Sequence, residues 1–329
     1  MKVKPLLHCH LLLTGLFPAM TVPRLPGLET LLAHARNAGR QEGDAAQWLC
    51  RLFGVERQHD WPVAPLSALG AGLVPGADYW LRADPVHLHL LRDRMVLAAG
   101  VPLELAGGEA ELLLAALNQH FAADGLEFFA PQPDNWFLRM KVPSSIRTYA
   151  LAEALGQDVE RMLPQGADAM LWHRRMNEIQ MLLHEHPVNT AREERGEPAV
   201  NSLWFWGGGV LPASVLSPLL TVRADDVLAL GLQRAGHGEA APLPSCAGDW
   251  LETLPGEGKH LVVLDMMKNI ERMEQYWFAP LLDGLKRGRI TSLHLHLAQR
   301  GRVDSFGVER IAGWKFWRRA QPLGDVFGG

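Results

Sequence analysis

Histidine pairs are the feature of this sequence with the most obvious chemical potential. Eight of the fourteen histidines are spaced as His-x-His, at His8/His10, His87/His89, His184/His186 and His294/His296. Residues two apart share one face of a β-strand, so each pair could offer two imidazoles to one metal ion. Aspartate is scarce beside these pairs, however, and the alternating Leu-His-Leu-His-Leu run over 293–297 is typical of a half-exposed strand. We therefore expect polar strand faces and predict no metal site.

The segment from 186 to 209 is the densest in polar and flexible residues. Three glycines, Gly207, Gly208 and Gly209, follow an expected strand over 202–206, and converging backbone N–H groups in such a turn suit an anion. Arg192 and Arg195 would add bidentate contacts to a phosphate or carboxylate. A helix end and a tight turn with solvated arginines fit the composition equally well, so both interpretations stay open.

An amphipathic helix is expected over 167–183. Its apolar face consists of Leu171, Ile179, Leu182 and Leu183. A polar stripe on the opposite face consists of His173, Asn177, Gln180 and His184, spaced 4, 3 and 4.

The elements that would position these residues alternate between strand and helix at both ends of the chain. The first part predicts a strand over 6–13, helices over 28–38 and 45–53, and a Pro- and Gly-rich loop over 61–76. The middle part predicts one helix over 108–123 among strands over 80–82, 86–91, 95–98, 126–130 and 136–142. The last part predicts helices over 225–235 and 269–286 and strands over 202–206, 219–222, 261–264 and 290–297, with a final strand ending near Trp317. This order indicates one α/β sheet built from both chain ends, carrying an inserted α+β domain.

Composition excludes several classes of protein. The chain has 329 residues, 48% of them hydrophobic, and a net charge of −4, as expected of a soluble protein of about two domains. This charge argues against nucleic acid or an anionic membrane surface as the main partner. No apolar stretch reaches the length of a membrane span.

The cysteines and the N-terminal segment indicate a cytoplasmic protein. Cys9, Cys50 and Cys246 lie far apart and form no Cys-x-x-Cys motif, so neither a disulfide framework nor a thiolate zinc site is expected. The apolar run over 6–17 superficially resembles a secretory signal, but His8 and His10 interrupt it. We expect a buried strand there.

The central motif resembles a known family. His186-Pro-Val-Asn189, Arg192, Gly196, Asn201 and the Trp206-Gly-Gly-Gly turn resemble the motif near the centre of archaeal-type cofactor-independent phosphoglycerate mutases, members of the alkaline-phosphatase-like superfamily. Weaker matches lie at 11–17, 26–32, 66–70, 80–94 and 271–282. The resemblance implies an α/β fold: an alkaline-phosphatase-like core sheet flanked by helices over 1–78 and 165–329, with an inserted α+β domain over 79–164.

The departures from this family concern its metal ligands. Such mutases need two divalent metals held by Asp and His, and a serine nucleophile. Thr14 replaces the first metal-binding Asp, and 59–62 reads His-Asp-Trp-Pro where Ser-Asp is expected. Where the family carries an Asp-x-x-x-His pair, 264–270 reads Leu-Asp-Met-Met-Lys-Asn-Ile, and the Asp-His expected after Leu293 is absent from 293–299. Two neighbouring dications repel each other unless carboxylates offset their charge. We therefore expect no cofactor, no bound metal and no mutase activity.

A closer resemblance is to proteobacterial regulatory proteins of the RpfE type, which carry stretches like Ala83-Asp-Pro-Val-His-Leu88 and the motif above. It implies a catalytically degenerate mutase-like protein with a regulatory or anion-binding role. The partner would be a phosphorylated or carboxylate small molecule, or a protein. The retained anion-binding residues would be Asn189, Arg192, Arg195, Asn201, Gly207, Gly208 and Gly209.

Two alternatives remain. The first is an active, phosphoglycerate mutase-like phosphotransferase or phosphohydrolase, with a rearranged site in which the histidine pairs and Asp265 bind Mn²⁺ or Zn²⁺. The second is a protein that only binds partners, through an aromatic surface around Trp314 and Trp317.

Overall fold

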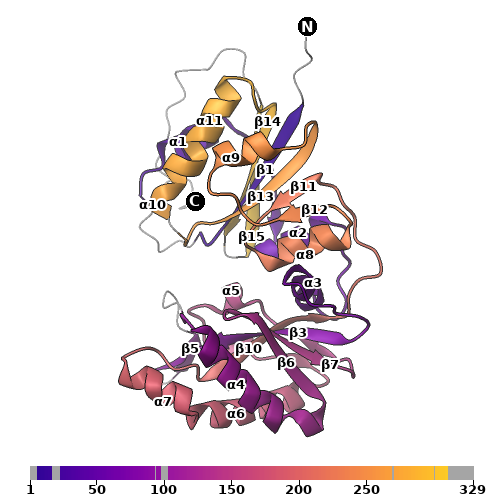
Figure 1. Ribbon diagram of the computed structural model, residues 1–329, viewed down its shortest axis with the longest axis vertical. Helices are drawn as coiled ribbons and strands as arrows, with labels where there is room; N and C mark the ends of the chain where they lie inside the picture. The colour runs from indigo at the N-terminus through magenta and orange to yellow at the C-terminus, as the bar shows by residue number, and fades with distance from the viewer. Residues whose placement is uncertain are drawn as a thin grey trace. The chain divides into compact units, whose positions relative to one another are not determined.

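The computed structural model describes residues 6–16, 23–92, 94–97, 103–268, 270–299 and 301–309 (Figure 1). The chain divides into two compact units. Unit 1 comprises Met1–Phe53 and Leu216–Gly329, and unit 2 comprises Gly54–Val215. Unit 2 is therefore an insertion between the two sequence halves of unit 1, as expected. Its boundaries, however, differ from the predicted 78/79 and 164/165.

Packing around a small sheet explains why unit 2 is larger than predicted. Helix α3 (Val63–Gly70) packs on strands β3 (Tyr79–Val86) and β10 (Ser202–Gly209), which pair with each other. Helix α6 (Ala169–His184) packs on the same sheet through Trp172 and Ile179. These flanking segments bury their apolar residues in unit 2, so they belong to it rather than to the core sheet.

Unit 1 is built on a seven-stranded sheet in the order β12-β11-β13-β1-β14-β15-β2. The strands from β12 to β14 run parallel; β15 runs antiparallel to β14, and β2 runs antiparallel to β15. The strands are β1 (Leu7–Thr14), β2 (Arg36–Glu42), β11 (Thr221–Arg223), β12 (Glu239–Ala241), β13 (Gly258–Asp265), β14 (Ser292–Gln299) and β15 (Arg302–Glu309). The helices are α1 (Pro26–His34), α2 (Ala45–Leu52), α8 (Val227–Ala235), α9 (Ala247–Thr253), α10 (Ile270–Met273), the π-helical η3 (Glu274–Phe278) and α11 (Ala279–Lys286).

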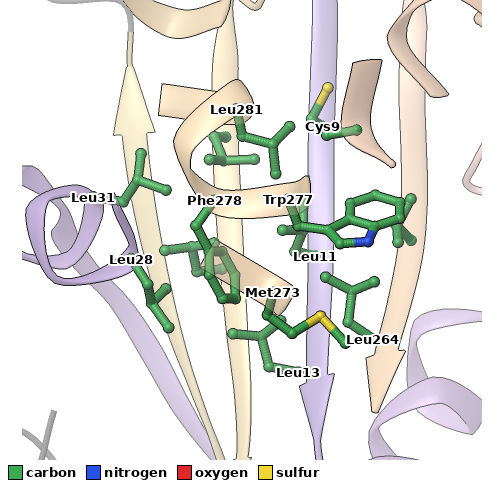
Figure 2. Packing of buried hydrophobic residues seen from close by; sticks show 14 of the residues in the cluster. Cys9, Leu11, Leu13, Leu28, Leu31, Leu264, Met273, Trp277, Phe278 and Leu281 are labelled. Atoms are coloured by element: carbon green, nitrogen blue, oxygen red, sulfur yellow. The ribbon is translucent and has the colours of Figure 1, made fainter. Parts of the chain in front are cut away.

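The centre of this sheet is β1, which pairs in parallel with β13 on one side and β14 on the other. Because side chains alternate along a strand, Cys9, Leu11 and Leu13 point to one face. There they pack with residues of α1, α10, η3 and α11, as Figure 2 shows for Leu28, Met273, Trp277, Phe278 and Leu281. The histidines of β1 point to the opposite face, toward which Trp48 of α2 projects.

Unit 2 contains an antiparallel sheet in the order β10-β3-β7-β6 and two small two-stranded sheets, β4-β5 and β8-β9. Helices α4 and α6 pack on one face of the larger sheet, and α3 packs on the other through Ala64 and Ala68. The remaining strands are β4 (Leu88–Leu91), β5 (Arg94–Leu97), β6 (Leu126–Gln132), β7 (Asn135–Met140), β8 (Ile146–Arg147) and β9 (Gln165–Gly166). The remaining helices are α4 (Gly107–His120), η1 (Ala122–Asp124), α5 (Leu151–Ala154), η2 (Val159–Met162) and α7 (Pro187–Glu194).

Three local predictions were wrong. The expected loop over 61–76 contains α3, whose residues are nearly all buried, so that no amphipathic period marks it as a helix. The helix expected to reach 38 ends at His34, and the polar edge strand β2 follows. The three glycines expected in a turn after β10 lie inside that strand.

No helix in the described ranges combines the length and the hydropathy needed to cross a membrane.

Phe278 and Tyr276 provide a test of the unit 1 core. Phe278 is fully buried among the residues of Figure 2, whereas Tyr276 is 39% exposed. We expect Phe278→Ala to lower the free energy of unfolding of unit 1 by about 3–5 kcal/mol, because it leaves a cavity. Tyr276→Ala should cost less than about 1 kcal/mol. Urea unfolding followed by tryptophan fluorescence measures both, and equal losses would show that the core is packed differently.

Candidate functional site

The carboxyl ends of β1 and β13 are the first place to look for chemistry. Thr14 and Asp265 end these strands and are paired in register. The Thr14 hydroxyl donates to the Leu264 carbonyl at 3.4 Å, and the Asp265 carboxylate accepts from the Met267 N–H at 3.0 Å. One carboxylate and one hydroxyl therefore lie side by side at this edge.

Gly15 shows that the turn after β1 is tightly fitted to Asp265. Its φ of +73° favours glycine, and a Cβ there would lie 2.6 Å from an Asp265 oxygen. The turn thus keeps the glycine of the Asp-Gly pair that the mutase resemblance implies, although Thr14 stands in place of the aspartate.

This donor set does not fit a pair of divalent cations. Such cations need several carboxylates to offset their mutual repulsion, whereas the paired ends of β1 and β13 carry one carboxylate, that of Asp265, beside the neutral hydroxyl of Thr14. In the part of the chain that the structure describes, no group of three or more His, Cys, Asp or Glu side chains is arranged to hold a metal ion.

Four imidazoles, those of His8, His10, His294 and His296, lie on the neighbouring strands β1 and β14; we call them the imidazole cluster. The Nδ1 of His10 and the Nε2 of His296 share a hydrogen bond at 3.1 Å, and the rings of His10 and His294 stack at 4.6 Å. His296 also bonds Ser305 Oγ through Nδ1 at 2.8 Å, and Trp48 packs 4.4 Å from its ring. The His8 Nδ1 bonds Ser292 Oγ at 2.8 Å.

Burial keeps the centre of the cluster uncharged. Desolvation, reinforced by the neighbouring imidazoles, lowers the pKa of both His10 and His296 to about 3. Burial also lowers the pKa of His294. The alternation of side chains along each strand was predicted from sequence. The proximity of the His8/His10 pair to the His294/His296 pair was not, because it depends on β1 and β14 being neighbours in the sheet.

One member of each of the two other histidine pairs serves local structure. The His87 Nδ1 bonds the Ala199 carbonyl at 2.7 Å, between β3 and β4. The His186 Nδ1 accepts from the Val188 N–H at 3.2 Å and so caps α7, whose first residue is Pro187. The His-Pro-Val-Asn sequence is thus the start of a helix.

The predicted anion-binding arginines are held by carboxylates. Arg192 is 1% exposed; it donates to Glu109 at 2.7 Å and to the carbonyls of Pro198 and Glu104. Arg195 donates to the other Glu109 oxygen at 2.6 Å and to Glu197. Burial alone would raise the pKa of the Glu109 carboxyl, but the Ala106 N–H and both arginines hold it below its usual range. An anion bound by these arginines would have to displace Glu109.

The predicted asparagines bond the backbone. The Asn189 amide group donates to the Leu183 and Val200 carbonyls, and its oxygen accepts from the Val200 N–H, all at 2.8 Å. The Asn201 side chain bonds both the N–H and the carbonyl of Leu88, at 2.7 and 2.8 Å.

Gly207 and Gly209 allow the start of α3 to approach β10 closely, and Gly208 makes room for Tyr79 of β3. A Cβ at Gly207 would lie 2.8 Å from Val63, and one at Gly209 would lie 2.7 Å from Pro62. A Cβ at Gly208 would lie 2.3 Å from the Tyr79 hydroxyl. No hydrogen bond or ion pair among the described residues joins these glycines to Arg192 or Arg195. The glycines therefore have a packing role, and anion binding at this segment stays a prediction.

The polar stripe of α6 borders a hollow. Asn177, Gln180 and His184 line it together with Asn201 of the predicted anion set, whereas His173 bonds the Pro164 carbonyl instead. Its other lining residues, Leu88, Met95 and Met181, were not predicted, because only the fold brings β4 and β5 opposite α6. We call this hollow, of about 490 Å³, the α6–β4 groove.

The aromatic surface predicted around Trp314 and Trp317 lies outside the described residues.

Comparisons with known proteins place the chain near one enzyme type. No protein-family model matches it. It is 27% identical over 154 residues to a probable 2,3-bisphosphoglycerate-independent phosphoglycerate mutase of Geobacter sulfurreducens, covering 45% of this chain and 38% of the relative. It is 24% identical over 154 residues to the 2,3-bisphosphoglycerate-independent phosphoglycerate mutase of Methanosarcina mazei, covering 45% and 37%. The match thus spans less than half the length of either relative.

The solved structure of the PH0037 protein from Pyrococcus horikoshii shares the fold. The TM-score is 0.54 at 14% identity, covering 93% of this chain and 88% of that one. The predicted α/β architecture, a core sheet flanked by helices with an insertion, is confirmed. At this identity the likeness concerns the fold alone.

The imidazole cluster predicts acid-sensitive stability. His10 and His296 have a folded pKa of about 3, below the ordinary value of 6.5, so between these values the unfolded state binds more protons. The free energy of unfolding should therefore be highest above pH 6.5 and decrease toward pH 3. At pH 5 the decrease should be about 2 kcal/mol for each histidine. Urea unfolding at pH 7 and pH 5 measures this loss. The double variant His10→Leu/His296→Leu should remove most of it, and an unchanged loss would place the sensitivity elsewhere.

The two arginines give a matched test of structural against anion-binding roles. Arg192→Ala should cost about 3 kcal/mol or more of unfolding free energy, because it removes a buried partner of Glu109. Arg195→Ala, at a side chain 47% exposed, should cost about 1 kcal/mol or less. Phosphate should raise the melting temperature of neither the wild type nor the variants. A phosphate-dependent increase that Arg192→Ala abolishes would instead establish an anion site.

Proposed function

We propose that this chain is a phosphoglycerate-mutase-like protein that has lost two-metal phosphoryl transfer and has a regulatory, binding role. The observation that carries the proposal is the pairing of Thr14 with Asp265 at the carboxyl ends of β1 and β13. The fitted glycine turn supports descent from a mutase-like site, and the missing carboxylate supports loss of its metals.

The binding role is supported by the α6–β4 groove. Asn201, from the predicted anion-binding residues, lies in this groove together with three residues of the polar stripe of α6. A small anion is a weaker candidate, because the predicted arginines already hold Glu109. A protein partner is the other candidate, and the three free cysteines favour a reducing compartment such as the cytoplasm.

The imidazole cluster favours a second candidate, a metal-dependent phosphotransferase or phosphohydrolase using His10, His296 and Asp265. Two imidazole nitrogens 3.1 Å apart resemble half of a transition-metal site. Three observations support a buried, neutral pair of His10 and His296 instead. The two rings share a hydrogen bond, Trp48 packs against His296, and the pKa of each histidine is low.

Metal content and turnover decide between the two. We expect purified protein to hold less than stoichiometric Mn or Zn and to turn over neither 3-phosphoglycerate nor p-nitrophenyl phosphate when either metal is added. Asp265→Asn should leave the background rate unchanged, as should the control Asp283→Asn at an exposed position.

Stoichiometric metal with turnover would contradict the proposed function, and the variants would locate the site. Loss of turnover in Asp265→Asn alone would place the site at the carboxyl edge. Loss in His10→Gln and His296→Gln would place it in the imidazole cluster and establish the second candidate.

A further inference from the structure

The α6–β4 groove lies where a strand ladder ends. Strand β10 pairs with β3 up to Ser202, which lies opposite Val86. The Asn201 N–H then donates to the Val86 carbonyl at 3.2 Å, and β4 follows β3 after His87. Beyond Asn201, the chain of β10 turns away to α7, so β4 continues without a backbone partner on that side.

The Asn201 side chain takes the place of one residue of that missing strand. Its amide accepts from the Leu88 N–H and donates to the Leu88 carbonyl, the two bonds that a neighbouring strand would make. Leu88 is therefore paired, although by a side chain. This mimicry shows that the edge of β4 points its hydrogen-bonding groups into the groove.

The next free position on this edge is Leu90. Backbone groups alternate in direction along a strand, so the N–H and carbonyl of Leu90 point the same way as those of Leu88. No hydrogen bond to the Leu90 backbone from outside the β4–β5 hairpin occurs among the described residues. The other edge of the hairpin is covered, because Val96 and Leu97 of β5 form bridges to Asp158 and Leu155.

The groove is lined by apolar and amide side chains. Leu88, Met95 and Met181 line it, Met181 of α6 is 73% exposed, and Leu90, two residues after Leu88 on β4, is 68% exposed. Asn177 and Gln180 offer amides that both donate and accept. Among the described residues the lining includes no Asp, Glu, Lys or Arg, so the groove fits a neutral chain better than a charged small molecule.

We propose that the α6–β4 groove binds an extended segment of a partner protein, which adds to β4 as a strand between β4 and α6. Its backbone would pair with Leu90, and apolar residues at every second position would contact Met95 and Met181. The proposal rests on the binding role proposed above and names the chemistry of the partner. The occupant is an extended peptide because Leu90 offers one N–H and one carbonyl on the outer edge of β4, the pair of groups that a residue of a neighbouring strand bonds.

The experiment uses peptides selected from a random ten-residue library on the full-length protein, with counter-selection on Leu90→Pro. Proline removes the Leu90 N–H, and the hairpin should tolerate it because that N–H points away from β5. Selected peptides should carry apolar residues at alternate positions. By calorimetry, their Kd should rise roughly tenfold in Leu90→Pro, the effect of a lost backbone hydrogen bond, and about threefold or less in Leu90→Ala, which keeps the N–H.

Methylation of peptide nitrogens gives a second readout that does not depend on the folding of any variant. Methyl groups at alternate positions should weaken binding at the nitrogens that face β4 and leave it unchanged at the others. A uniform effect along the peptide, or no enriched peptide, would overturn the inference. Self-association of the wild type that Leu90→Pro abolishes would also overturn it, because the occupant would then be a second copy of this chain.

The outcome is separable from that of the proposed function. Metal-dependent turnover without peptide binding would refute both, and turnover with peptide binding would refute only the loss of catalysis. Absence of turnover together with absence of peptide binding would refute this inference alone.

Discussion

The parallel pairing of β1 with both β13 and β14 is the constraint on which the rest of unit 1 depends. It buries Leu11 and Leu13 on one face, where the helices that return the chain between strands cover them. The same alternation places His10 and His296 together on the other face. It also sets Thr14 beside Asp265 at the carboxyl edge. A shift of one residue in this register would expose the core and bury more imidazoles.

Unit 2 depends on close packing and on the buried ion pair between Arg192 and Glu109. Glycines in β10 let α3 lie directly on the sheet, since any side chain there would collide with Val63 or Pro62. On the other face, α4 and α7 are joined through Glu109 and Arg192. Residues that look suited to bind a ligand are thus used to hold helices and strands together. Similar residue types serve both purposes, since both require convergent donors.

The proposed loss of catalysis and the proposed binding site depend on different units. The first rests on unit 1, where Thr14 lies beside Asp265 next to the glycine turn. The second rests on unit 2, where Asn201 bonds Leu88 at the groove between α6 and β4. A fold can lose its metals and still retain a surface that binds, because the two depend on different residues.

The sequence by itself determined the α/β class, the insertion, and most elements with a clear period, such as α6 and β14. It also showed that residue 14 is a threonine without a carboxylate, because a residue type is read directly from the chain. Only the tertiary structure showed α3, whose near-complete burial hides its period, and the neighbourhood of His10 and His296, which are distant in sequence. It likewise decided that Arg192 faces Glu109 and that Asn201 pairs with Leu88. These partners lie more than 80 residues apart, and side-chain type and local spacing carry no information about which distant group fills a hydrogen bond.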